Sequence, residues 1–147
     1  MTGIAKLIGY TGVWLCLSCF IYTNTAAQSK CITVQDTLLH QTVYTTVDKQ
    51  PYYKAGYQQF VYSIMKQLKL DPKFEEITGT VYMTFVVQKD GRINGIRVSR
   101  DIQPTHGYYS HQLKSIIKKY KLEPALCNNK PVAVLFTVPF RINILAE

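Results

Sequence analysis

The most constraining pattern in the chain is a long alternation of apolar residues near its C-terminus. Apolar side chains occupy every second position of this run, namely Val132, Val134, Phe136, Val138, Phe140, Ile142 and Ile144. Because every second residue of a β-strand faces the same side, the run predicts a long strand with one strongly apolar face. Such a face needs a second layer of structure to cover it.

A β-hairpin is predicted before this strand. Residues 80–89 alternate with the strand period, and two turn signals follow them, Asp90-Gly91 and Asn94-Gly95. A turn at Asp90-Gly91 places Met83 opposite Val98 and gathers apolar side chains on one face, whereas a turn at Asn94-Gly95 does not. The register therefore favours the first turn. Asn94-Gly95 then lies inside the second strand, at a bulge or a close backbone approach.

Two segments follow the helical period. The first has an apolar face made of Tyr57, Phe60, Val61, Ile64 and Leu68. Asp71-Pro72 ends that helix near Leu70. The second follows Gly107 and has an apolar face made of Tyr109, Leu113, Ile116, Ile117 and Tyr120. Three strands and two helices predict an α+β fold, a two-layer sandwich with both helices packed on one face of a three-stranded antiparallel sheet.

The first 27 residues have the layout of a secretory signal peptide. Lys6 precedes an apolar stretch over residues 7–22, and Thr25 and Ala27 are the small residues before the expected cleavage point. The apolar stretch has about 16 residues, fewer than the roughly 20 that span a bilayer. We therefore expect an exported protein with a cleaved leader. A leader retained as an inner-membrane anchor is the alternative.

The rest of the chain divides into a short leader and one domain. Residues 28–41 are polar and lack a clear period, which predicts a flexible leader, and residues 42–147 form the predicted domain. Residues 42–47 fit a short strand. Cleavage of the signal peptide would leave Cys31 and Cys127, which either pair in an oxidising compartment or stay as free thiols. The sequence leaves both options open.

Charge and the spacing of reactive residues favour a binding protein over an enzyme. The 17 Lys and Arg outnumber the 9 Asp and Glu, giving a formal net charge of +8. This charge suits an acidic partner, but no run is as dense as a nucleic-acid-binding arm, so nucleic acid is not a predicted partner. His106 and His111 would lie about 140° apart on a helix, which is not a metal-ligand spacing. No catalytic residue, metal or cofactor is predicted.

Four motifs carry a resemblance to a known family. Residues 79–93, GTVYMTFVVQKDGRI, resemble the pattern G-x-V-x-V-x-F-V-V-x-x-D-G-x-I, and residues 43–56, VYTTVDKQPYYKAG, resemble V-F-x-x-V-E-x-x-P-x-F-P-G-G. Leu122-Glu123-Pro124 stands where W-x-P is usual, and residues 129–132, NKPV, resemble G-K-P-V. In order and content these motifs resemble the C-terminal domain of TonB-type energy transducers, in the form common in Bacteroidetes. The long linker of those transducers has no counterpart in residues 28–41.

The resemblance implies a periplasmic protein-binding domain. In the family, a short segment of an outer-membrane transporter docks by adding a strand to the last strand of the sheet. The residues implied in partner binding here are Leu135, Thr137, Pro139, Arg141 and Asn143 on the last strand, with Gln50, Pro51, Tyr52 and Tyr53 as a second segment. The implied partner is an outer-membrane TonB-dependent receptor or another envelope protein.

Pro139 suggests which edge of the last strand is free. Proline has no N–H to donate, so in a regular ladder its missing donor should point away from the paired hairpin. The N–H and C=O groups of Leu135, Thr137, Arg141 and Asn143 should then point the same way. A bulge at Pro139 is the rival, because it would turn the later residues toward the hairpin.

Two alternatives belong to other classes of function. The lysines of the second helix could bind peptidoglycan or an anionic lipid surface, and that binding should weaken steeply with ionic strength. The free edge could instead serve a homodimer, which light scattering over a concentration series would detect.

Overall fold

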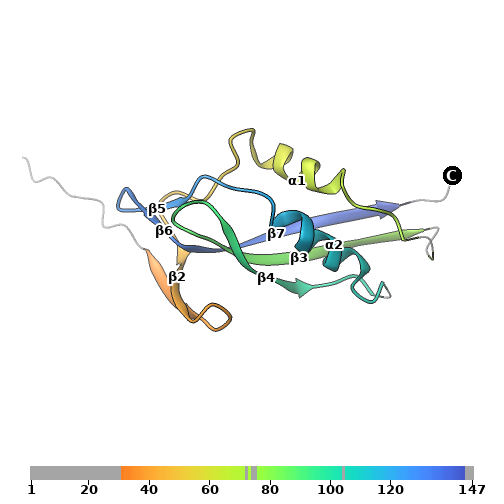
Figure 1. The fold of residues 1–147 in the computed structure, drawn as a ribbon, viewed down its shortest axis with the longest axis horizontal. Helices are drawn as coiled ribbons and strands as arrows, with labels where there is room; N and C mark the ends of the chain where they lie inside the picture. Colours follow the sequence, from red (N-terminus) through yellow and green to blue (C-terminus); the bar gives the residue numbers. More distant parts are fainter. Residues whose placement is uncertain (1–30, 72, 74–75, 104, 145–147) are drawn as a thin grey trace, which may run out of the picture.

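The computed structural model describes residues 31–71, 73, 76–103 and 105–144, so the predicted signal peptide lies outside the described residues. In chain order the elements are β1 (Ile32–Asp36), β2 (Gln41–Thr46), α1 (Tyr57–Met65), β3 (Ile77–Val87), β4 (Ile93–Arg100), α2 (Tyr108–Ile117), β5 (Ala125–Cys127), β6 (Lys130–Val132) and β7 (Val134–Ile144). Figure 1 shows their arrangement. Within the described residues, neither helix has the length and hydrophobicity needed to cross a bilayer.

A mixed five-stranded sheet forms the centre of the fold, in the order β1-β2-β7-β3-β4. The antiparallel ladder between β3 and β7 runs from Ile77 opposite Ile144 to Val87 opposite Val134 without a register shift. Strand β2 joins the other side of β7 in parallel, with Tyr44 opposite Val134. A separate two-stranded sheet pairs β5 with β6.

The hairpin of β3 and β4 has the predicted turn. Met83 lies opposite Val98 as predicted, whereas the pairs nearer the turn, such as Val87 with Ile93, are shifted by one residue from the predicted register. Gly91 has φ of 83°, a conformation that favours glycine, and a Cβ there would lie 1.9 Å from the carbonyl oxygen of Leu122. The ladder is irregular between Thr84 and Val86, across from Gly95, as expected for a glycine inside the second strand.

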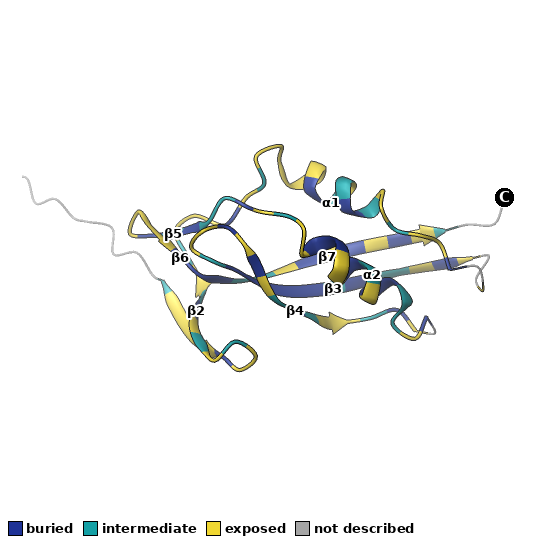
Figure 2. Cartoon of the chain, in the orientation of Figure 1, coloured by how far each residue is buried: buried dark blue, intermediate teal, exposed yellow. Residues whose placement is uncertain are grey.

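The predicted helices supply the apolar layer. Helix α2 buries four apolar side chains, Tyr109, Leu113, Ile116 and Ile117. Helix α1 buries Phe60 and Ile64 and ends at Met65, earlier than predicted, because the N–H groups of Gln67 and Leu68 bond three residues back, in a tighter turn. Figure 2 shows buried residues along β3, at alternating positions of β7 and on part of α2.

The N-terminal part of the fold differs from the prediction. The prediction of a three-stranded antiparallel sheet is wrong, because β2 and β1 extend the sheet beyond β7. Within the segment interpreted as a flexible leader, residues 32–36 form β1, which pairs with β2. We call β1, β2 and the turn between them, residues 32–46, the N-terminal hairpin.

The N-terminal hairpin covers one end of the sheet on the face opposite the helices. A small apolar cluster joins Val43 and Leu39 of the hairpin to Val86, Ala133 and Leu135. Val86 alternates with core residues of β3 that face the helices, so this cluster lies on the other face. The sheet is therefore covered on both faces at this end.

Candidate functional site

One edge of β7 is only partly occupied. The N–H of Tyr44 donates to the C=O of Ala133 at 2.8 Å, so the Ala133 carbonyl points away from β3. Pro139 lies opposite Tyr82 in an unshifted ladder, which removes the bulge alternative. Peptide groups alternate in direction along a strand, so those of every second residue after Ala133 point toward the same outer edge. Pro139 is one of these residues, which agrees with its lack of an N–H to donate to β3.

The outer edge of β7 is open beyond Val134. Within the part of the chain that the structure describes, β2 pairs with β7 only at Val134, and no strand lies beside the later residues on that side. The outward-turned residues Thr137, Pro139, Arg141 and Asn143 all have exposed side chains. We call residues 136–144 on this side the β7 edge.

Leu135 does not belong to this open edge. Its side chain is half-buried in the apolar cluster under the N-terminal hairpin, together with Val43 and Ala133. The hairpin thus occupies the start of β7 and limits the accessible edge to the residues that follow.

Polar side chains on β7 hydrogen-bond to side chains of the neighbouring strand β3. The hydroxyl groups of Thr84 and Thr137 hydrogen-bond at 2.8 Å, and Thr84 also bonds with Ser99 on β4. The hydroxyl of Thr78 donates to the amide oxygen of Asn143 at 2.8 Å. With these side chains engaged across the sheet, the groups left for a partner on the β7 edge are mainly peptide N–H and C=O groups.

The segment Gln50–Tyr53 lies elsewhere and already has a main-chain partner. Tyr52 exchanges two hydrogen bonds with Glu123, at 2.8 and 3.2 Å. Pro51 is buried, and the ring of Tyr53 packs against Phe60, with a centroid distance of 5.7 Å. Gln50 and Tyr52 are exposed. The structure therefore separates the two predicted groups of site residues, and the backbone of Tyr52 serves the fold.

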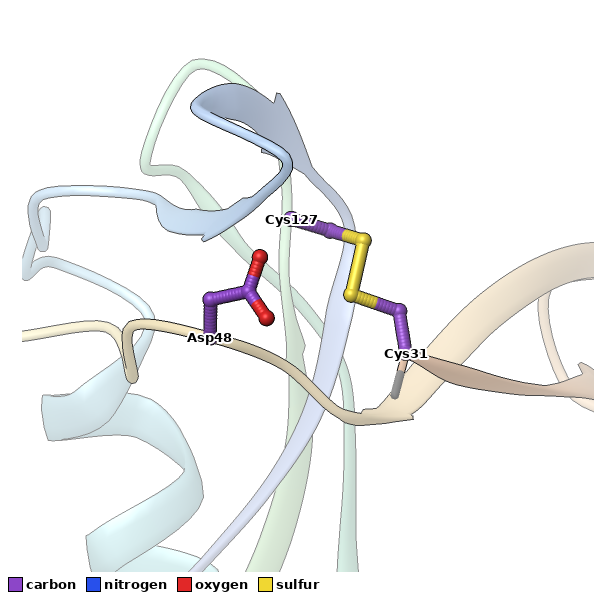
Figure 3. A group of neighbouring side chains, drawn as sticks. All are labelled: Cys31, Asp48 and Cys127. Carbon is purple, nitrogen blue, oxygen red and sulfur yellow. A yellow bond between two sulfur atoms is a disulfide. The ribbon is translucent and has the colours of Figure 1, made fainter. Parts of the chain in front are cut away.

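Cys31 and Cys127 form a disulfide (Figure 3), with their Cα atoms 6.2 Å apart. The bond joins the residue before β1 to the end of β5. The carboxylate of Asp48 lies beside it, within 4.8 Å of both sulfurs, and accepts the N–H of Asn128 at 2.7 Å. Bonded sulfurs present no thiolate, the form in which cysteine binds metal ions. The cluster therefore functions as a crosslink.

A buried ion pair joins the N-terminal hairpin to β4. The carboxylate of Asp36, whose side chain is fully buried, accepts a hydrogen bond from the guanidinium of Arg97 at 2.6 Å. It also accepts the N–H groups of Leu38 and Leu39, which shapes the turn. Burial raises the pKa of Asp36, but the hydrogen bonds and the charge of Arg97 outweigh it, so the pKa lies below its ordinary value.

No protein-family model matches this chain. No curated protein matches it significantly either. The resemblance to the TonB C-terminal domain therefore rests on the four motifs quoted above.

Proposed function

We propose that this protein is a periplasmic protein-binding domain that takes an extended peptide on the β7 edge. The observation that carries the proposal is the unequal pairing of β7. One side is paired with β3 along the whole strand, whereas the other has a strand neighbour only at Val134 among the described residues. Strand addition satisfies such outward peptide groups and takes its affinity from main-chain hydrogen bonds.

The geometry of the edge limits what it can bind. The N-terminal hairpin blocks the start of β7, and Pro139 offers a carbonyl but no N–H, so the hydrogen-bonding pattern has one gap. A peptide bound beside residues 136–144 would cover about 30 Å of strand. The exposed guanidinium of Arg141 would favour a partner with an acidic residue at that point.

The partner class comes from the TonB resemblance. A peptide segment of an outer-membrane transporter, or of another envelope protein, is the proposed ligand, with export through the leader over residues 1–27 placing both in the periplasm. Docking of this domain on the transporter would then contribute to transport. The proposal assigns this chain no catalytic residue.

The test is binding of synthetic peptides copied from the N-terminal segments of outer-membrane transporters, measured by calorimetry and by backbone amide shifts. A bound peptide should shift and protect the amides of Thr137, Arg141 and Asn143. Thr137→Pro should abolish binding and lower Tm by less than about 4 °C, since its N–H points away from β3. Thr137→Val, which keeps the N–H and removes only the hydroxyl, should still bind.

Two results would contradict the proposal. One is binding by Thr137→Pro at the affinity of the parent protein, because an open peptide edge cannot survive that substitution. The other is a concentration-dependent dimer by light scattering that Thr137→Pro dissociates, because the edge would then be filled by a second copy.

A further inference from the structure

A second open edge lies on the opposite side of the sheet, where a groove runs along β4. It is bounded by Leu38 and Leu39 from the turn of the N-terminal hairpin, residues 93–96 of β4, Lys114 of α2 and Lys118 at the C-cap of that helix. Its volume is about 300 Å³. Strand β4 is last in the sheet order, so among the described residues no further strand covers this stretch. We call this feature the β4 groove.

Peptide groups of β4 point into the groove. The C=O of Arg92 accepts the N–H of Gln88 at 2.8 Å, so it points toward β3. By alternation Ile93 turns the other way. The ladder shifts at Gly95, whose φ is 59°, and the C=O of Gly95 accepts a contact of 3.5 Å from the guanidinium of Arg97. The groove therefore offers main-chain groups to an added strand.

The walls of the groove are apolar on the hairpin side. Leu39 packs so closely on Gly95 that a Cβ at that position would lie 3.0 Å from its Cδ1 atom. Leu38 is 54% exposed at the tip of the turn. Ile93 and Ile96 are buried and form the floor. An apolar side chain of a bound peptide would contact these groups and exclude water from them.

The helix side of the groove is positively charged. Lys114 lies in the last turn of α2 and Lys118 is the C-cap residue after it; both are exposed, and neither is ion-paired with a described residue. No acidic residue lines the groove. The charge of Asp36, on the adjoining turn, is buried and paired with Arg97. The groove thus lacks a negative charge to balance its two lysines.

We propose that the β4 groove binds a second extended peptide, one in which acidic side chains alternate with apolar ones. The apolar side chains would lie between Leu38 and the β4 floor, and the acidic ones would face Lys114 and Lys118. The main chain would bond to the outward peptide groups of Ile93. This site is separate from the β7 edge and does not depend on the function proposed for that edge.

The test uses the full protein and a synthetic acetylated heptapeptide of alternating valine and glutamate, followed by backbone amide shifts. Shifts should concentrate at Ile93, Gly95 and the lysines of α2. The double variant Lys114→Glu with Lys118→Glu should weaken binding about ten-fold or more. A matched double variant in the segment after α1, Lys66→Glu with Lys69→Glu, changes net charge equally and should leave affinity within about two-fold.

Other outcomes would overturn the proposal. Equal weakening by both double variants would mean that net charge alone attracts the peptide. Shifts confined to Thr137 and Arg141 would place the peptide on the β7 edge. Binding to phosphatidylglycerol vesicles without binding of the heptapeptide would assign Leu38 and its neighbouring lysines to an anionic bilayer. Retention of peptide binding by Thr137→Pro separates this site from the β7 edge.

Discussion

Replacing Asp36 should release the N-terminal hairpin from the sheet. Its fully buried carboxylate bonds to Arg97 at 2.6 Å, to the N–H of Leu39 at 2.9 Å and to the N–H of Leu38 at 3.1 Å. Asp36→Ala removes all three hydrogen bonds and leaves the guanidinium of Arg97 without a counter-charge. Asp36→Asn keeps an acceptor for the turn and removes only the charge.

The magnitudes follow from these contacts. A hydrogen bond to a charged group contributes about 1.5–3 kcal/mol and a neutral one about 1 kcal/mol. Arg97 is about one-third exposed and Leu38 is more exposed, so water can replace part of what is lost. We therefore expect Asp36→Ala to lower the free energy of unfolding by about 3–4 kcal/mol, and Asp36→Asn by about 1.5–3 kcal/mol.

Urea unfolding measures both losses, and a double-mutant cycle with Arg97→Met isolates the ion pair. Amide hydrogen exchange should show faster exchange in β1 and β2 than in β3 and β7 for the Asp36 variants. A coupling energy below about 0.5 kcal/mol would refute the reasoning, because it would mean that the two side chains do not stabilise one another. Equal exchange across all strands would also refute the local role.

The same carboxylate predicts a pH dependence. The pKa of Asp36 is lowered in the folded protein, so its stabilisation is complete above the unfolded value of about 3.9 and is lost as pH falls from there through the lower folded pKa. Urea midpoints should therefore fall more steeply below about pH 4 in the parent protein than in Asp36→Asn. Parallel curves would contradict the assignment.

Three further predictions concern the core, the turn and the crosslink. Phe85→Ala should lower the free energy of unfolding in urea by about 3–5 kcal/mol, because Phe85 is fully buried. Tyr82→Ala, on the other face and half-buried, should lower it much less. Equal losses would contradict the hairpin register. Gly91→Ala should unfold the protein or lower Tm sharply, since φ there is 83° and the Cβ would overlap a carbonyl oxygen; a normal melt would contradict this turn. Replacing Cys31 and Cys127 by serine should lower the free energy of unfolding by about 2–5 kcal/mol, because the disulfide closes a loop with a sequence separation of 96. An unchanged melt would mean that the crosslink does not restrict the unfolded chain.

The local parts of the fold could be predicted from the sequence. The turn at Asp90-Gly91 follows from cross-strand pairing, and Met83 opposite Val98 confirms it. The outward direction of Pro139 follows from its missing N–H and agrees with an unshifted ladder. In each case the prediction depends on residues that are close together in the sequence.

Of the N-terminal hairpin, only β2 could be predicted in this way, since the short strand expected over residues 42–47 matches it. Strand β1 is polar and short, and the docking of the hairpin depends on partners far along the chain. Asp36 meets Arg97 across 61 residues, and Cys31 meets Cys127 across 96. Tyr52 likewise finds its main-chain partner at Glu123. Contacts between residues so far apart leave no periodic pattern within a single segment. The sequence of residues 32–36 alone therefore predicts part of a flexible leader.

The disulfide also determines how a mechanical load would pass through the molecule. A pull applied at Cys31 is transmitted through the covalent bond to Cys127, at the end of β5, and from there along β6 to Val134 at the start of β7. The N-terminal hairpin and both helices lie outside this route. Tension between an attachment before Cys31 and a peptide held on β7 would therefore shear the peptide along its strand, the direction in which many hydrogen bonds resist at once.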